Sequence, residues 1–490
     1  MNLRERLLFL FTSTRGLVLT AIALVSLVVV IWGTLSGPMA EFGLKDITVR
    51  LFGFDLVEAE REGRIIMLYH TIAMAVVAVV VYFITSLLPM KRSEQAHING
   101  LVTVGYITSL IFGLLFGYFG SNWAFHGLFI FGQSLIFFAG LLLLKALWPW
   151  KREYLIQSGE YARGPGGIDL ERVAFFVMAT TTLISALFGA VPGTYFGNGF
   201  EAFMAENVVR EPFKTDLQKA VIGHLHIMLS LIGVALALIV GRSMDFKGKL
   251  QKWAMPLYMS GSIVLSLGVW LLVPLDEIAH LIIYAGSALV LPGALLLVIF
   301  GWRKLIRDGL AEKGIVKANL GQRISALIRD PLKFGQLWQM VFMNFTVTFI
   351  GLFMAAELDM IRRWPAREEH VLLTGHWHIL AGIIGTILLL YYADRIGLKG
   401  KVRQWFGWLV IIGADVAFAA MTLYESKRLY VIESAQQPLV DGAVLVADAG
   451  MVILLATLGV LMVWRLIDLF KSGGHWSREL AEDKNDGEVS

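Results

Sequence analysis

Twelve runs of mostly apolar residues, each about 20 residues long, occupy most of the chain and constrain its fold more than any other feature. About 20 apolar residues are needed for one helix to cross the ~30 Å hydrocarbon core of a bilayer. The runs cover residues 16–37, 64–88, 99–120, 123–147, 171–192, 218–241, 252–274, 278–301, 337–357, 370–393, 404–424 and 443–468. A helix satisfies its backbone hydrogen bonds internally, so we expect an all-α integral membrane protein with twelve transmembrane helices.

The composition supports this class and excludes several kinds of site. Charged residues make up 16% of the chain and hydrophobic residues 57%, whereas soluble domains carry about 25% charged residues. The chain has no cysteine, which excludes thiolate haem ligands, iron–sulfur clusters and covalently attached c-type haem. The net charge of +4 does not come from a basic cluster typical of nucleic-acid binding, so we expect no nucleic-acid partner.

Basic residues gather on one side of the expected membrane. The loops that follow even-numbered runs contain Lys91-Arg92, Lys151-Arg152, 242–252, 303–333 and 395–403. The N-terminus is also basic, and the positive-inside rule makes this side cytoplasmic, with both termini inside. Residues 1–472 are then one membrane domain, followed by a polar cytoplasmic tail at 473–490.

Seven histidines lie on even-numbered runs, near the ends that this topology places at the outer face. Each lies roughly 3–9 residues inside its run, about 5–13 Å deep at 1.5 Å per residue. They are His70, His126, His224, His226, His280, His376 and His378. Seven imidazoles at a similar depth suggest a set of metal or cofactor ligands.

Two of these runs carry a His-x-His pair, His224/His226 and His376/His378. At about 100° per residue, positions i and i+2 point about 200° apart on one helix. A single metal cannot use both imidazoles of such a pair as it uses an i, i+4 pair. A helix that lies between two cofactors, however, can offer one imidazole to each of them.

A weak internal repeat accompanies the histidines. His70 and His226 are 156 residues apart, His226 and His378 are 152 apart, and His126 and His280 are 154 apart. This spacing predicts three pseudo-repeated arcs of four helices around a pseudo-threefold axis. The third counterpart of His126 and His280 falls near 441–448, where there is no histidine.

Haem iron is the metal centre that these histidines suit best as ligands. Iron held by two histidines is six-coordinate and transfers electrons, whereas iron held by one histidine can bind a gas or a substrate. A copper or zinc site needs three or four converging side chains. A lone buried histidine is often only a hydrogen-bonded core group, and for His126 and His280 that reading stays open.

The chain resembles the catalytic subunit of haem–copper oxidases and their nitric oxide reductase relatives, especially the C-type oxidases. The shared features are twelve spans, inside termini, a span-2 histidine and the His-x-His pair on span 10. The resemblance implies that His70 and His378 hold a low-spin haem and that His376 is the proximal ligand of a second haem. The family's span-6 histidine, at the place of His224/His226, helps to hold a second metal.

The chain also departs from the family at that second metal. Span 7 (252–274) contains no histidine, although the family uses an adjacent pair there, and no glutamate follows His226 closely on span 6. We therefore expect no copper site. His224 or His226 then becomes the second ligand of the haem held by His376, and the remaining one faces spans 2 to 4 and His126, where a third haem is a further hypothesis.

Polar residues near these helices complete the set of candidates. Lys427 and Arg428 lie where the family binds haem propionates, and Arg362 and Arg363 precede span 10. Asp415 lies within span 11 and Asp448 within span 12. Each is either a proton-path residue or a hydrogen-bonded partner between helices, and we favour the second reading.

These features predict a b-type membrane cytochrome with two haems, or three, in the cytoplasmic membrane of a bacterium or archaeon. It exchanges electrons with the quinone pool and with an outer-face partner, such as a c-type cytochrome, within a respiratory complex. A divergent terminal oxidase or nitric oxide reductase with an open haem at His376 is the alternative. A non-redox metal-binding membrane protein is the second alternative.

Overall fold

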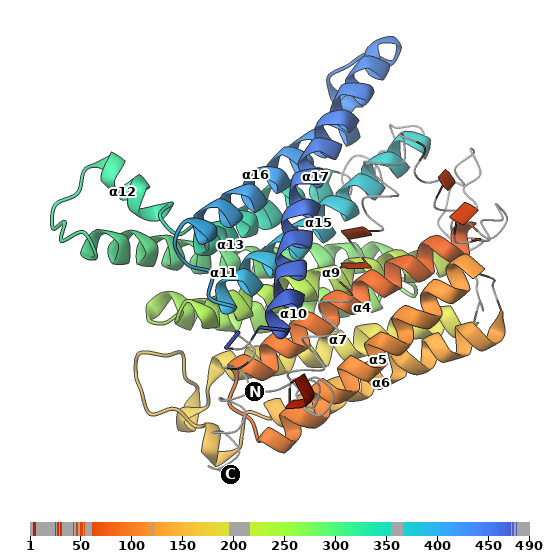
Figure 1. Ribbon diagram of the computed structural model, residues 1–490. Coiled ribbons are helices and arrows are strands. Elements are labelled where there is room, and N and C mark those ends of the chain that lie inside the picture. Colours follow the sequence, from red (N-terminus) through yellow and green to blue (C-terminus); the bar gives the residue numbers. More distant parts are fainter. Residues whose placement is uncertain are drawn as a thin grey trace. The chain divides into compact units, whose positions relative to one another are not determined.

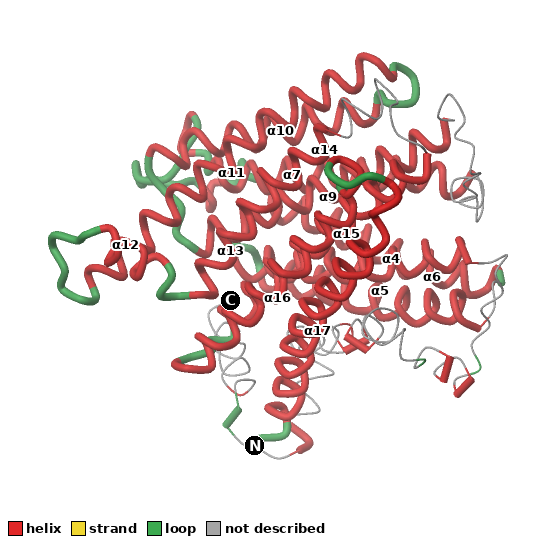
Figure 2. Tube along the Cα trace, turned by 90° about the horizontal axis from the view of Figure 1, so that it is seen from above, coloured by secondary structure: helices red, strands yellow, loops and turns green. Residues whose placement is uncertain are grey.

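The structure is a computed structural model that describes residues 61–119, 122–195, 216–353 and 366–471, with isolated positions nearer the two termini (Figures 1 and 2). Helices are the only extended regular elements in these ranges, and an isolated bridge joins Arg163 to Asp169. Ten of the described helices are long and apolar enough to cross a membrane. The expected class, an all-α multi-pass membrane protein, is confirmed.

The helices follow the predicted apolar runs closely. Their bounds are α4 (Arg61–Leu87), α5 (Arg92–Phe119), α6 (Trp123–Leu147), α7 (Leu170–Tyr195), α9 (Asp216–Ser243), α10 (Lys249–Trp270), α11 (Asp276–Ala311), α12 (Leu320–Leu327), α13 (Pro331–Val341), α14 (Thr348–Phe353), α15 (Ala366–Arg395), α16 (Gly400–Glu425) and α17 (Gln436–Leu469). Single 3-10 turns occur at Arg152–Tyr154, Pro165–Gly167, Lys427–Leu429 and Glu433–Ala435. The predicted run 16–37 lies almost entirely outside the described residues.

The predicted run 337–357 is not one continuous α-helix. A π-helical turn, Phe342–Val347, separates α13 from α14. The Asn344 side-chain amide donates to the Met340 carbonyl four residues earlier, at 2.7 Å. That carbonyl is the usual acceptor of the Asn344 backbone N–H, so the side chain competes with the α-helical bond there. Such turns occur frequently at functional sites.

The chain divides into two compact units. The first contains residues 1–154, 189–205 and 455–490, and the second contains residues 155–188 and 206–454. In the first unit, α4, α5 and α6 pack side by side. In the second, α15 packs against α9, α13 and α16, and α10 pairs along its length with α11.

Three helix pairs approach so closely that glycine is required at the contact. On α5 and α6, a Cβ added to Gly132 would lie 2.6 Å from the Gly105 carbonyl oxygen. On α10 and α11, a Cβ on Gly286 would lie 2.5 Å from the Leu265 nitrogen. On α16 and α17, a Cβ on Gly450 would lie 2.6 Å from the Gly413 carbonyl oxygen. Small residues at such crossings are how membrane helices bring their backbones together.

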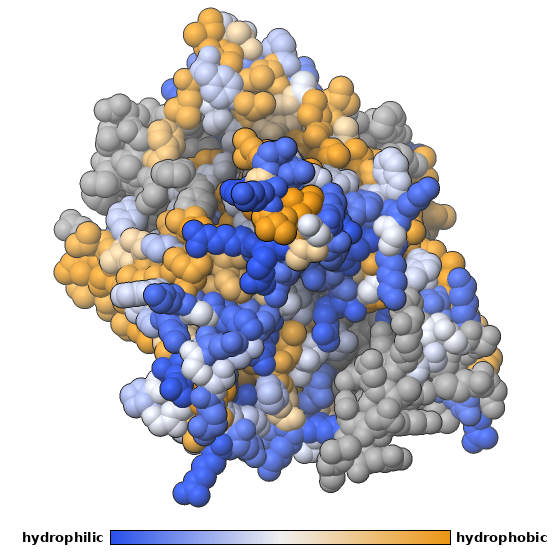
Figure 3. Space-filling view, turned by 90° about the vertical axis from the view of Figure 1, so that its left-hand side faces the viewer, coloured by the Kyte–Doolittle hydropathy of each residue, from blue (hydrophilic) through white to orange (hydrophobic). Residues whose placement is uncertain are grey.

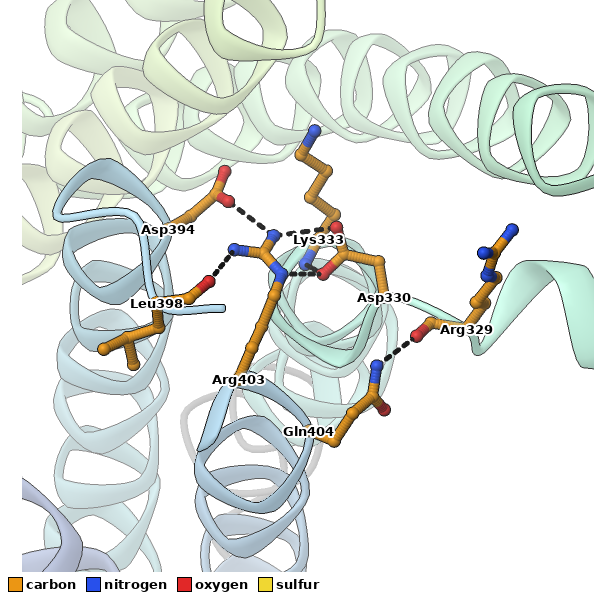
Figure 4. Close-up of polar contacts among 7 residues, drawn as sticks. All are labelled: Arg329, Asp330, Lys333, Asp394, Leu398, Arg403 and Gln404. Atoms are coloured by element: carbon orange, nitrogen blue, oxygen red, sulfur yellow. Dashed lines mark hydrogen bonds and ion pairs between the residues drawn. The ribbon is translucent and has the colours of Figure 1, made fainter. Parts of the chain in front are cut away.

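A charged cluster joins α13, α15 and α16 at one end of the second unit (Figure 4). The guanidinium of Arg403 donates from Nε and Nη2 to the two carboxylate oxygens of Asp330, at 2.9 and 2.7 Å. Its Nη2 also contacts Asp394 at 2.5 Å, and Asp330 caps the start of α13. The Gln404 side chain donates to the Arg329 carbonyl at 2.7 Å. One arginine therefore holds the ends of three helices together.

Replacing Arg403 by alanine is expected to destabilise the second unit by about 1–3 kcal/mol, because two half-buried carboxylates lose their shared cation. Chemical unfolding in detergent measures this loss. Arg395→Ala is the matched control, since Arg395 is exposed beside the same cluster and forms no ion pair among the described residues. Equal stability of the two variants would contradict this role of Arg403.

The loop between α6 and α7 is held against the turn between α9 and α10. The Tyr161 hydroxyl donates to Asp245 at 2.7 Å, and Lys247 contacts both Asp245 and Glu160 at 3.1 Å. Partial burial by itself raises the pKa of Asp245, but the hydrogen bonds from Tyr161 and Lys247 outweigh it and hold that pKa below its usual value. These contacts order a basic end of the second unit.

Candidate functional site

All seven candidate histidines lie on helices, in the part of each helix nearer its N-terminus. They occupy α4 (His70), α6 (His126), α9 (His224 and His226), α11 (His280) and α15 (His376 and His378). These helices coincide with the even-numbered apolar runs of the predicted topology. Because successive spans alternate in direction, the N-termini of these helices belong to one face of the membrane in the predicted topology.

His376 of α15 and His226 of α9 lie close together in the second unit. The His376 side chain is 6% exposed, and its Nδ1 has no hydrogen-bond partner. His226 is near enough to interact electrostatically with it. The His226 ring also contacts the edge of Trp377, with the ring centroids 5.7 Å apart. Buried polar nitrogens are nearly always paired, so an unpaired buried imidazole nitrogen calls for an explanation.

The two histidines of α15 point in different directions, as the i, i+2 spacing predicts. His376 is buried, whereas His378 is exposed. The same is true of the α9 pair, because His226 lies beside α15 while His224 Nδ1 lies 3.0 Å from the Ser185 carbonyl oxygen of α7. We expected the second span-6 histidine to face spans 2 to 4. Among the described residues, His224 contacts Ser185 of span 5, and the expected direction toward spans 2 to 4 stays a prediction.

Gly351 packs closely against His376. A Cβ on Gly351 of α14 would lie 3.3 Å from His376 Cε1 and 3.5 Å from Nε2. The π-helical turn lies nearby: Met343 packs on Gly233 of α9, where an added Cβ would be 3.6 Å from its terminal carbon. The irregular part of span 9 thus packs against α9 and α15, the helices that carry His226 and His376.

The remaining histidines have different surroundings. In the first unit, His70 meets Phe129 edge-on at 6.5 Å, and His126 packs on Phe116 at 5.7 Å. His280 is partly exposed, and its Nδ1 lies 2.9 Å from the Asp276 carbonyl oxygen and 3.2 Å from the Asp276 carboxylate. That contact matches the reading of His280 as a hydrogen-bonded group at a helix start.

The predicted propionate-binding cations lie at the C-terminal end of α16. Lys427 is buried, with its ammonium 4.8 Å from the centre of the Tyr424 ring, and Arg428 is half-buried. Arg362 and Arg363 lie outside the described residues.

Sequence reasoning missed Glu425, which precedes these cations. Its side chain is buried, and both carboxylate oxygens lack a hydrogen-bond partner. It lies against Gly375, directly before His376, where a β-carbon would clash with it. A glutamate at the end of an apolar run, next to two cations, was the available signal.

The region near span 7 lacks the ligands that a second metal needs. α10 carries no histidine, and the indole Nε1 of Trp270 donates to the Ser185 hydroxyl at 3.2 Å, beside His224. Across the described residues, no three His, Cys, Asp or Glu side chains converge as a metal site would require. Iron in a haem takes one or two protein ligands, whereas a protein-only zinc or copper site takes three or four.

Asp415, the carboxylate within span 11, is a partner between helices. It accepts hydrogen bonds from Trp338 Nε1 at 2.8 Å and from Gln339 Nε2 at 2.7 Å. These bonds join α16 to α13 and satisfy the half-buried carboxyl group, in agreement with the hydrogen-bonding reading. Asp448 is half-buried on α17.

Comparisons with known proteins identify no relative: no protein-family model and no curated protein matches this chain.

Proposed function

We propose that this protein is a multi-haem b-type membrane cytochrome that transfers electrons between the quinone pool and a redox partner at the outer face. The observation that carries the proposal is that His226 and His376 lie on packed helices, α9 and α15, with the His226 ring against Trp377, the residue next to His376. His376 is buried and keeps an unpaired nitrogen. Two histidines from facing helices are the ligand set of a six-coordinate, electron-transferring haem.

In this proposal, His226 and His376 hold one iron from opposite sides. A bound haem supplies the one-electron chemistry, and the protein supplies ligands, orientation and a dry environment. Lys427, which is buried, and Arg428, which is half-buried, would balance the charges of the two propionates.

A second haem is proposed from the resemblance, with His70 and His378 as its ligands. The opposite directions of the two α15 imidazoles support it, because they leave His378 outside the His226–His376 pair. Two haems are the proposed content, and a third haem near His126 is a further hypothesis from the sequence.

The scaffold that we propose is the twelve-helix arrangement of the haem–copper oxidase catalytic subunit, built as three arcs of four helices. The close glycine contacts support the repeat. Gly105, Gly261 and Gly413 are 156 and 152 residues apart, the same spacings that separate His70, His226 and His378. Their partners Gly132, Gly286 and Gly450 lie on the following helices, 154 and 164 residues apart. The inferred arcs thus share a helix contact as well as a histidine.

The proposed topology keeps both termini in the cytoplasm. The connections after α9, α11 and α15 lie at one end of the second unit, and this end carries Lys247, the basic segment 303–333 and Arg403 at the start of α16. We assign this end to the cytoplasmic side of a bacterial or archaeal membrane. The histidines then lie toward the outer face, within reach of a c-type cytochrome or another subunit of a respiratory complex.

Optical spectra of the purified protein, oxidised, reduced, and reduced with carbon monoxide, test the proposal. We expect two b-type haems per chain, low-spin spectra in both oxidation states, and little carbon monoxide binding because both axial positions are occupied. Reduction by a short-chain quinol should be complete, whereas a buffer control without quinol should leave the haems oxidised.

Two results would replace this function by another. A carbon monoxide adduct at one haem per chain would favour the oxidase or nitric oxide reductase alternative, with an open position at His376. A purified, folded protein without a Soret band after expression with haem supplementation would favour the non-redox alternative. Full haem content without reduction by quinol would remove the quinone pool from the proposal.

A further inference from the structure

The segment 303–333 between α11 and α13 has a surface that the electron-transfer proposal does not use. α12 packs one side against the end of α11, where a Cβ on Gly309 would lie 3.0 Å from the Ala326 β-carbon. Its opposite side is exposed and apolar, with Leu320 74% and Ile324 50% exposed. Val316, in the turn before α12, is 96% exposed. Three exposed branched side chains in one short segment need a partner.

Cations share this surface. At 100° per residue, Arg323 lies on the same side of α12 as Leu320 and Ile324, and Lys313 and Lys317 lie in the preceding turn. Lys313, Lys317 and Arg323 are exposed and form no ion pair among the described residues. The surface therefore combines apolar side chains with three uncompensated positive charges.

The acidic residues of the same segment do not neutralise these cations, because each has another partner. Asp308 pairs with Arg307 at 3.1 Å, Glu312 pairs with Arg329, and Asp330 pairs with Arg403 at 2.7 Å. The partner of this surface must consequently bring both anionic and apolar groups.

The position of α12 along α11 indicates which partner this is. α11 has 36 residues, about 54 Å at 1.5 Å per residue, so it extends well beyond a hydrocarbon core of about 30 Å. Its apolar run ends at Gly301, and Gly309 lies eight residues further, about 12 Å along the axis. That distance corresponds to the headgroup layer, and much of the surface of α11 is not buried inside the chain.

We propose that α12 and the turn before it form an interfacial anchor that binds anionic phospholipid. Val316, Leu320 and Ile324 insert among the upper acyl chains, while Lys313, Lys317 and Arg323 contact the headgroup phosphates. Figure 3 faces the end that carries α12 and shows hydrophilic residues over much of it, with apolar patches between them. Short amphipathic helices with this composition lie in the plane of the membrane interface. The proposal is independent of haem binding.

The chain has no cysteine, so one introduced cysteine reports on a single position. Leu320→Cys, carrying a nitroxide label in the full-length protein, is placed in nanodiscs of phosphatidylcholine with and without phosphatidylglycerol. We expect the anionic discs to raise collisions of the label with membrane-soluble oxygen and to lower collisions with a water-soluble nickel chelate. Lys313→Gln, Lys317→Gln and Arg323→Gln together should lower the ratio of membrane-inserted to water-exposed label in anionic discs by a factor on the order of a hundred.

A matched control removes the same charge from another turn at this end. Arg395→Gln, Lys399→Gln and Lys401→Gln together change three exposed cations of the α15–α16 turn, and they should leave the response of the Leu320→Cys label unchanged. A label equally accessible to water in both discs would overturn the proposal. So would protection of the label that appears only when a partner protein is added. The labelled chain with all its native cations gives the lipid comparison even if the neutralised variant does not fold.

Discussion

Replacing His376 by alanine is expected to remove one haem per chain, the largest functional effect of any single substitution proposed for this protein. His226 would remain as one ligand, but α15 would supply no second ligand. A cavity would replace the buried His376 side chain. Haem content, measured against protein concentration, should fall from two haems to one, with the remaining low-spin spectrum preserved. Bound cofactor stabilises a folded protein, so the thermal midpoint should also fall.

His226→Ala is expected to have the same effect as His376→Ala, and the double variant should lose no more than either single one. Residues that act on one ligand are strongly non-additive in this way. His280→Ala is the matched control, because its ring nitrogen is already engaged by Asp276 and it should keep both haems. Unchanged haem content in both His226→Ala and His376→Ala would refute the assigned ligand pair.

The second large effect is expected for Gly132→Ala on α6. Its new β-carbon would lie 2.5 Å from the Ser109 hydroxyl oxygen and 2.6 Å from the Gly105 carbonyl oxygen and the Ser109 nitrogen. Two of these are backbone atoms, so α5 and α6 must separate along their contact. We expect a loss of stability of at least about 1–3 kcal/mol, the range for overpacking. Thermal unfolding in detergent measures it.

Gly127→Ala provides the comparison on the same helix, because a β-carbon there meets no atom within 4 Å. Alanine is a better helix former than glycine, so this variant should be unchanged or up to ~1 kcal/mol more stable. Gly286→Ala, at the equivalent contact of α10 and α11, should destabilise like Gly132→Ala. If Gly132→Ala and Gly127→Ala unfold at the same temperature, the backbones do not meet as described.

The helical part of the fold was predictable because the membrane imposes one strong rule. Apolar length selects helices, and ten described helices match the predicted runs. The π-helical turn was not predictable, because it depends on a single side chain, Asn344, competing for the Met340 carbonyl. Apolar periodicity does not record such competition.

The proposed repeat has a second signal in the sequence besides the histidine spacing. Gly105, Gly261 and Gly413 repeat at the same intervals as His70 and its counterparts, and glycine is costly inside a helix unless packing requires it. Their recurrence could therefore have been noticed in the sequence. Their partners across each helix pair could not, because a contact between two helices depends on their crossing point.

For the candidate site, the sequence by itself determined which helices carry imidazoles, at what depth, and that each His-x-His pair faces two ways. Only the tertiary structure decided that His226 and not His224 lies beside His376, and that Glu425 lies against Gly375. The reason is rotation: helical periodicity sets the angle between two side chains on one helix, whereas the direction that each faces depends on how that helix packs against its neighbours.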